Sequence, residues 1–279
     1  MSILKTFNIR DGRQRKQTIE VLYEDDHLVA VNKPAGLRVI PDSFNAALPN
    51  LLTMLESRYR KALGQEGQQL WVVHRIDMHT SGVVIFARTP EMHRHLNQMF
   101  EHGEVQKTYW AVVRGHVQPR EGRIDFPMAP HPSRSRMMII SEKGKPARTD
   151  YRVLEEFEHF TLVEVYPRTG RTHQIRVHFQ AIGNPLAIDP IYAKTLSIDI
   201  SNLKRDVVRK RHSLDETPPA LMQRLTLHAL RLSFTHPLTG KSFEVEAALP
   251  KDFRALLSAL RKWDKRKSPT ESPSLPGPQ

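Results

Sequence analysis

The chain has 279 residues, and its 42 Lys and Arg against 30 Asp and Glu give a formal net charge of +12. Apolar residues make up 39% and charged residues 26%, which excludes a wholly disordered chain. There is no cysteine, so disulfides, thiolate zinc sites, iron–sulfur ligation and cysteine nucleophiles are excluded.

The excess of positive charge is typical of a folded protein that binds a polyanion, because neutralising phosphates releases their counterions. A merely basic surface is the alternative. No apolar segment resembles a secretion signal, and none approaches the ~18 apolar residues of a membrane span. We therefore expect a cytoplasmic protein with no membrane partner, and we expect a monomer.

The chain divides into three parts by composition. Residues 1–20 are charged without periodicity and predict a leader or an edge strand. Residues 21–263 predict one folded domain, interrupted by insertions at 130–145 and 196–223. Residues 264–279 are rich in Lys, Ser and Pro and predict a disordered tail.

The first predicted elements are a buried strand at residues 28–31, followed by a Pro/Gly turn at 32–36, and an amphipathic helix at 48–63. An apolar β-branched strand follows at 83–87. Thr89 and Pro90 predict the start of a second helix, with a hydroxyl N-cap and Pro at the first helical position, and Gly103 predicts its end.

Further strands are predicted at residues 108–113, 160–166, 230–234 and 243–247, and a last helix at 252–263. Strands outnumber helices and do not alternate with them. This order indicates an α+β fold with a mixed, largely antiparallel central sheet flanked by helices.

The insertion at residues 196–223 is basic, with Lys204, Arg205, residues 209–211 and His212. It either contacts nucleic acid or forms a solvated loop, and composition favours neither.

The densest polar cluster covers residues 73–82, directly before the apolar strand at 83–87. A polar loop anchored on a buried strand can hold a carboxylate at the floor of a cleft. Asp77 is the candidate. Taken alone, an Asp beside an Arg is more often a turn-forming ion pair than a reactive group.

A second cluster, residues 168–178, concentrates three arginines and two histidines where a helix is predicted to start, with Thr172 as N-cap. Exposed N–H groups, the helix dipole and the arginines would form an anion site. A solvated cationic helix end is the alternative, and the alternation of residues 174, 176 and 178 also suits a strand.

The third element is the strand that starts at Lys107, whose alternation places Tyr109 on one face with Ala111 and Val113. A strand tyrosine is usually part of the core, but in a cleft it can stack on an unpaired base. The histidine pairs 74/79 and 173/178 lack the spacing of a helical zinc site, and no glycine loop for ATP or NAD is present. No metal is therefore expected.

In this order the three clusters resemble the RluA type of pseudouridine synthase, a family that modifies uridines in ribosomal and transfer RNA. The signature His-Arg-Leu-Asp-x-x-Thr-Ser-Gly is matched by residues 74–82, with Ile76 in place of leucine. Residues 107–109 match the Lys-x-Tyr strand, and residues 170–178 match Gly-Arg-x-His-Gln-x-Arg-x-His. Residues 32–36, 227–229 and 235–237 agree as well, so the resemblance covers roughly residues 20–250.

The resemblance implies a fold, an activity and roles for single residues. Asp77 would be the catalytic aspartate, Tyr109 would pack against the target base and assist proton transfer, and Arg176 would pair with Asp77. Arg75 would help to displace the target nucleotide. The other residues expected to bind RNA or substrate are His74, Thr80, Ser81, Lys107, Arg171 and His173.

Isomerising uridine to its C-linked form involves no redox change and no net hydrolysis, so no cofactor is expected, and RNA is the expected partner. Two departures from the family pattern concern the loop at residues 185–189, which lacks the usual glycine before the aspartate, and the long insertion at 196–223. A base-removing glycosylase that uses the same Asp77 and a catalytically silent RNA-binding module are the alternatives.

Overall fold

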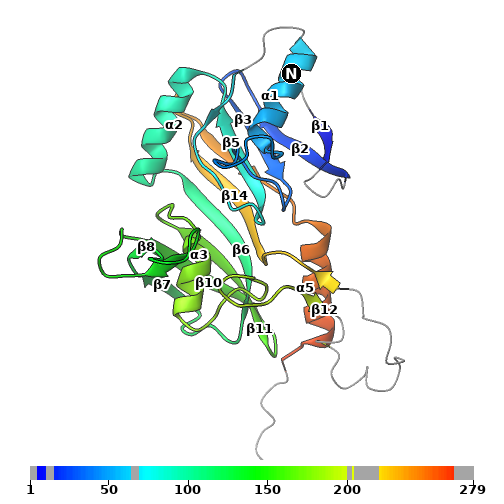
Figure 1. Cartoon of the computed structure of the whole chain (residues 1–279), viewed down its shortest axis with the longest axis vertical. Helices are drawn as coiled ribbons and strands as arrows, with labels where there is room; N and C mark the ends of the chain where they lie inside the picture. Colours follow the sequence, from blue (N-terminus) through cyan, green and yellow to red (C-terminus); the bar gives the residue numbers. More distant parts are fainter. Residues whose placement is uncertain (1–4, 11–15, 64–68, 200–202, 204–219, 267–279) are drawn as a thin grey trace, which may run out of the picture.

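The computed structural model describes residues 5–10, 16–63, 69–199, 203 and 220–266. They form one large sheet with the strand order β1-β2-β3-β5-β14-β6-β11-β10-β7, to which β4 adds at β5 and β15 at β14 (Figure 1). Its strands are β1 (Thr6–Arg10), β2 (Lys16–Glu24), β3 (Leu28–Lys33), β4 (Trp71–Val72), β5 (Ser81–Ala87), β6 (Gln106–Arg114), β7 (Glu121–Asp125), β10 (Arg148–Glu156), β11 (Phe160–Pro167), β14 (Leu227–Thr235) and β15 (Ser242–Glu246).

The remaining elements pack around this sheet. Two small two-stranded sheets pair β8 (Met128–Pro130) with β9 (Met138–Ile140) and β12 (Ile198–Asp199) with β13 (Ala220–Met222). The helices are α1 (Leu51–Leu63), α2 (Pro90–His102), α3 (Gln174–Ala181) and α5 (Lys251–Trp263). The predicted α+β class with a mixed, largely antiparallel sheet is confirmed.

Two halves of the sheet meet at one parallel pair of strands. β5 and β14 run parallel, with Ser81 beside His228 and Gly82 beside Ala229, whereas the other named strand pairs of the sheet are antiparallel. Gly82 is required there: a Cβ on it would lie 2.0 Å from the Ala229 carbonyl oxygen, and its φ of 118° disfavours a side chain. The loop that contains Asp77 ends at this seam.

The helices cover opposite faces of the sheet. On β6, Tyr109, Ala111 and Val113 point to the face where α1 and α3 pack. The intervening Trp110 and Val112 point to the face that carries α5, and α2 packs on that same face beside β5. The period-2 alternation expected for this strand is confirmed.

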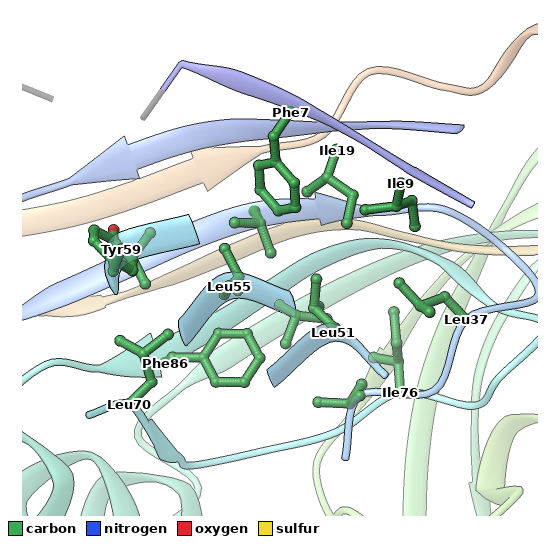
Figure 2. Close-up of a cluster of buried hydrophobic side chains, with 14 of the residues drawn as sticks. Phe7, Ile9, Ile19, Leu37, Leu51, Leu55, Tyr59, Leu70, Ile76 and Phe86 are labelled. Carbon is green, nitrogen blue, oxygen red and sulfur yellow. The ribbon is translucent and has the colours of Figure 1, made fainter. Parts of the chain in front are cut away.

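The N-terminal strands belong to the sheet. Phe7 and Ile9 of β1 and Ile19 of β2 lie in the same apolar cluster as Leu51 and Leu55 of α1 (Figure 2). β1 is the edge strand that the sequence offered as one possibility, and the predicted boundary between residues 20 and 21 falls inside β2. Polar or charged residues stand between the apolar residues of β1 and β2, so these segments were not recognised as alternating strands from the sequence.

Helix α2 has the ends predicted from its sequence. The Thr89 hydroxyl accepts a hydrogen bond from the Met92 N–H at 3.2 Å, and Gly103 ends the helix in the left-handed conformation. Helix α3 differs: His173, not Thr172, is the N-cap residue, with φ 57° and no side-chain cap bond. The side chain of Gln174 accepts the Arg171 N–H at 3.0 Å instead, which leaves the His173 ring free to point inward.

The C-terminal boundary also differs from the prediction. Asp264, expected at the start of a disordered tail, is 3% exposed and accepts hydrogen bonds from the backbone and ring of His159. Residues 267–279 and the basic residues 204–212 of the insertion lie outside the described residues. The described helices include none that is long and apolar enough to cross a membrane.

Candidate active site

A cavity of about 510 Å³ opens on the face of the sheet that carries α1 and α3. All three sequence clusters contribute to it. Among its lining residues are His74, Arg75, Ile76, Asp77, Thr80, Phe100, Lys107, Tyr109, Arg168, Arg171, His173, Arg176 and Leu227. Folding thus brings together nine of the ten residues singled out from the sequence.

Asp77 lies in the loop before β5, and its side chain is 24% exposed, so the carboxylate reaches the cavity. The loop is held by the Pro/Gly turn after β3. The carbonyl of Met78 accepts hydrogen bonds from the Gly36 N–H at 2.8 Å and from the Lys33 ammonium at 3.1 Å. Lys33 is fully buried and also donates to two carbonyls of its own turn, and burial lowers its pKa to about 7.

Arg176 is the centre of the site. Its Nη1 donates to Asp77 Oδ2 at 3.0 Å, while Nε and Nη2 donate to the two oxygens of Asp189 at 2.7 and 3.0 Å. Burial alone would lower the Arg176 pKa, but the hydrogen bond to Asp189 and the charge of Asp77 outweigh it and raise the pKa. The arginine therefore stays charged and donates to the carboxylate that faces the cavity.

Asp189 fixes the direction of this guanidinium. It is fully buried, and one of its oxygens also accepts the N–H groups of Ile191 and Tyr192 at 2.9 and 3.0 Å. The guanidinium is planar, and a rigid carboxylate holds its Nε and Nη2. Its remaining nitrogen, Nη1, can therefore donate in only one direction. That direction leads to Asp77.

His173 approaches the same carboxylate oxygen. Its Nε2 lies 4.0 Å from Asp77 Oδ2, and its Nδ1 lies 2.9 Å from the Tyr192 hydroxyl. That hydroxyl accepts the N–H of Met138 at 2.9 Å, and we assign its own proton to His173 Nδ1, the acceptor within reach. The ring proton of neutral His173 then lies on Nε2, toward the cavity.

Burial and one aromatic contact complete this geometry. Burial lowers the pKa of His173, which keeps it neutral near pH 7. The ring of Tyr192 lies under the guanidinium of Arg176, with 4.9 Å between the ring centre and Cζ.

Tyr109 lines the cavity from β6, as expected if it faces a cleft. Burial and the nearby charge of Asp77 raise its pKa above the ordinary value for tyrosine. Its hydroxyl therefore remains protonated and can donate a hydrogen bond.

The other predicted residues that line the cavity differ in their burial and in their hydrogen-bond partners. His74 stacks on Phe100 and accepts the Ile85 N–H at 3.0 Å, and burial lowers its pKa to about 3. Arg75 and Arg171 are exposed at the rim. Thr80 is buried, and its hydroxyl lacks a hydrogen-bond partner among the described residues.

Ser81 is the one predicted substrate-binding residue that does not reach the cavity. It is 1% exposed, and its hydroxyl lies 2.9 Å from His228 Nδ1 on the neighbouring strand. His228 Nε2 lies 3.0 Å from the Ala247 carbonyl, to which it must donate, so Nδ1 accepts the Ser81 proton. Alternation along β5 turns Ser81 away from the loop that carries Asp77.

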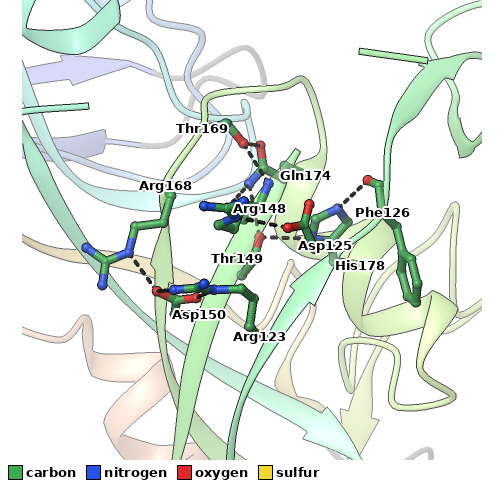
Figure 3. A network of polar contacts seen from close by, with 10 residues as sticks. All are labelled: Arg123, Asp125, Phe126, Arg148, Thr149, Asp150, Arg168, Thr169, Gln174 and His178. Carbon is green, nitrogen blue, oxygen red and sulfur yellow. Dashed lines mark hydrogen bonds and ion pairs between the residues drawn. The ribbon is translucent and has the colours of Figure 1, made fainter. Parts of the chain in front are cut away.

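Sequence reasoning missed Asp189, Tyr192 and Gln174. Asp189 ends a short apolar run at residues 186–188, and a buried run that ends in a carboxylate was the available signal. Gln174 is 4% exposed and bonds to Thr149 and Thr169, in a polar network that also includes His178 (Figure 3). This network anchors the start of α3 to β10.

The described residues contain no cluster of three or more His, Asp or Glu that could hold a metal ion. The cavity holds the Asp77 carboxylate clamped by a buried arginine, a neutral imidazole and a protonated phenol, with a second carboxylate, Glu101, and further arginines in its lining. This set suits a reaction that needs an ionised carboxylate and hydrogen-bond donors on a polyanionic substrate.

Comparison with known proteins agrees with this chemistry. The model of the RNA pseudouridylate synthase family matches residues 27–181, a segment that includes Asp77, Tyr109 and Arg176. The chain belongs to this family.

Individual relatives give the same result. The chain is 40% identical over 257 residues to the "Ribosomal large subunit pseudouridine synthase D" of Nitrosomonas europaea, covering 92% of this chain and 70% of the relative. It is 36% identical over 235 residues to the "Dual-specificity RNA pseudouridine synthase RluA" of Escherichia coli, covering 84% and 93%. Among solved structures, the human RNA pseudouridylate synthase domain containing 4 matches with a TM-score of 0.67 and 26% identity, over 86% of this chain and 92% of that one.

The resemblance read from the three clusters is thereby confirmed, and the enzyme is an RNA pseudouridine synthase, an isomerase. Neither a glycosylase nor a silent RNA-binding module is supported by these relatives.

Proposed function

We propose that this enzyme converts uridine to pseudouridine in ribosomal or transfer RNA, with Asp77 as its catalytic residue and Arg176 as its charge partner. The observation that carries the proposal is the 3.0 Å bond between Arg176 Nη1 and Oδ2 of Asp77, whose carboxylate lines the cavity. The names of the relatives, which act on ribosomal RNA or on more than one RNA, support the substrate class.

The reaction breaks the bond from C1′ to N1, rotates the freed uracil and joins C1′ to C5. The C5 proton is lost and N1 gains one, so atoms balance without a cofactor. The Asp77 carboxylate either attacks C1′ or removes the 2′ proton, and both routes need it ionised. In either case the guanidinium of Arg176, 3.0 Å away, holds the carboxylate in place.

The target base must leave its stack to reach Asp77. Unstacking costs a few kcal/mol, which phosphate contacts and stacking on an aromatic ring offset. Tyr109 supplies the ring and the exposed Arg75 fills the space that the base vacates. His74, Thr80, Lys107, Arg171 and His173 contact the nucleotide or its backbone, each from the cavity lining.

A tritium-release assay tests this proposal. RNA transcribed with tritium at uridine C5 is incubated with the wild-type protein and with Asp77→Asn, and we expect release by the wild type only. Asp252→Asn is the matched control, since Asp252 binds Arg224 with two bonds of 2.7 Å outside the cavity. Activity retained in Asp77→Asn contradicts the assigned role, and free uracil in the products indicates a glycosylase.

We further propose that the protein acts in the cytoplasm as a monomer, in keeping with a ribosomal or transfer RNA substrate. Light scattering after size-exclusion chromatography tests the oligomeric state, with 32.2 kDa expected for the monomer.

A further inference from the structure

Lys107 lies on a wall between the main cavity and a second, smaller pocket of about 150 Å³. The two share Lys107, Pro167 and Arg168 in their linings. The smaller pocket lies at the end of α2 and the beginning of β6, and its other lining residues are Gly103, Val105, Gln106, Thr108 and Tyr166. The two pockets are therefore neighbours on either side of this wall.

The charge of Lys107 is not neutralised within the described part of the chain. Its Nζ donates to the Thr169 carbonyl at 3.2 Å, and no carboxylate among those residues lies at ion-pair distance. Burial and the nearby charge of Arg168 lower its pKa to about 8. A half-buried ammonium beside a second cation gains free energy from an anion.

Arg168 contributes a second positive group to the wall. Its Nε donates to Asp150 Oδ2 at 2.8 Å, but Asp150 also accepts from Arg123 Nε at 2.7 Å (Figure 3). One carboxylate thus serves two arginines, and the Arg168 side chain is 51% exposed. The wall keeps a net positive charge.

An everted uridine in the cavity stays joined to the RNA by a phosphate on each side, and each phosphate must cross the rim. Lys107 and Arg168 are the cations that the rim presents toward the second pocket. Charge-assisted bonds from Lys and Arg are the usual way in which proteins hold a phosphodiester.

We propose that Lys107 and Arg168 form a phosphate subsite for the nucleotide next to the everted uridine, so that the RNA strand leaves the cavity over this wall into the second pocket. This inference rests on the proposed function, because it takes the RNA strand as the occupant of the cavity.

The first test measures how salt affects binding. The probe is the shortest RNA hairpin from which the wild-type protein releases tritium, and the dissociation constant is measured by fluorescence anisotropy over a range of KCl concentrations. Lys107→Met should weaken binding about tenfold or more, the effect of one charge-assisted hydrogen bond. It should also reduce the slope of log K against log salt by about 0.7, the value for one phosphate of a single strand.

Matched variants separate charge from structure. Lys107→Arg should restore most of the affinity and the slope, and Arg168→Gln should weaken binding in the same way as Lys107→Met. Lys241→Met, at an exposed position outside both pockets, should change neither quantity. A wild-type slope in both Lys107→Met and Arg168→Gln overturns the proposal.

The second test locates the phosphate. One uncharged methylphosphonate replaces the phosphate on either side of the target uridine in turn. At one of the two positions, the methylphosphonate should weaken binding by the wild-type protein. The same methylphosphonate should not weaken binding by Lys107→Met any further, because both changes remove the same contact. Additive losses at both positions overturn the proposal.

The outcomes also distinguish the two proposals. If no RNA releases tritium with the wild-type protein, the proposed function fails. If tritium is released, but both variants keep the wild-type salt slope and the methylphosphonate losses are additive, only the subsite proposal fails.

Discussion

The guanidinium of Arg176 connects two carboxylates that lie 112 positions apart in the sequence, and each has a different task. Asp189 holds the arginine in place, and Asp77 receives its remaining N–H at the cavity. Because Oδ1 of Asp189 also accepts two backbone N–H groups, the carboxylate is fixed and the arginine cannot turn without losing both of its bonds to it. Asp189 is thus a positioning residue that acts on Asp77 through Arg176.

We expect Asp189→Asn to lower kcat by about 10- to 100-fold with little change in KM, because the amide cannot hold the guanidinium at two positions. Unfolding in urea should show a loss of about 3 kcal/mol, typical of a broken buried ion pair. Asp252→Asn is the control with the same bidentate geometry outside the cavity and should keep kcat. An unchanged kcat in Asp189→Asn contradicts the positioning role.

Tyr192 sets the proton position on His173. In Tyr192→Phe the Nδ1 of His173 has no donor, so the proton is shared between the two ring nitrogens. We expect kcat to fall about tenfold, with a free energy of unfolding only about 1 kcal/mol lower. Tyr151→Phe, which removes a hydroxyl bonded to the Pro119 carbonyl, should leave kcat unchanged. Equal rates for the two variants would argue against a role for the His173 tautomer.

At the scale of elements, the site depends on the seam between β5 and β14. β5 carries the Asp77 loop at its start, and β14 pairs on its other side with β6, which carries Tyr109 and Lys107. The two strands approach closely at Gly82 and Ala229. The distance between Asp77 and Tyr109 is therefore set by how these strands pack.

Gly82→Ala should prevent this approach, since its Cβ would lie 2.0 Å from a backbone oxygen that cannot move without separating the strands. We expect a loss of more than about 3 kcal/mol in the free energy of unfolding, or failure to fold. Gly183→Ala is the control: its φ is also positive, at 84°, but nothing lies within 4 Å of the added Cβ, so about 1 kcal/mol is expected. Similar losses for both variants would assign the effect to φ alone.

At the scale of the whole molecule, buried histidines make stability depend on pH. Burial lowers the pKa of His228 to about 4 and that of His74 to about 3, whereas the unfolded value is about 6.5. Between these values the unfolded chain binds more protons than the folded one. The stability contributed by neutral His228 is present above pH 6.5 and is lost as pH falls toward 4.

Between pH 7 and pH 5 this loss is about 2 kcal/mol for His228 alone, from the unfolded value of about 6.5. Urea unfolding at both pH values checks it. His228→Gln should be less stable at pH 7 and should lose about 2 kcal/mol less between the two pH values than the wild type. His102→Gln, at an exposed position, should follow the wild-type curve. A wild-type stability that does not change over this range contradicts the neutral, buried state of His228.

Much of the secondary structure was readable from local pattern, because caps and periodicity act over a few residues. Thr89 and Gly103 bound α2, and the apolar run at residues 83–87 lies in β5, as predicted. The same reasoning failed at Thr172 and at the boundary between residues 20 and 21, where a glutamine side chain from the next turn and a partner strand decide the conformation.

The residue types in three ordered clusters were sufficient to predict the chemistry, the family and nine residues of the cavity. Contacts between distant segments were needed to place Ser81 against His228 and to recruit Asp189 and Tyr192 to Arg176. The reason is physical: a side chain's residue type limits which bonds it can make, but its direction and its burial depend on the elements that pack around it.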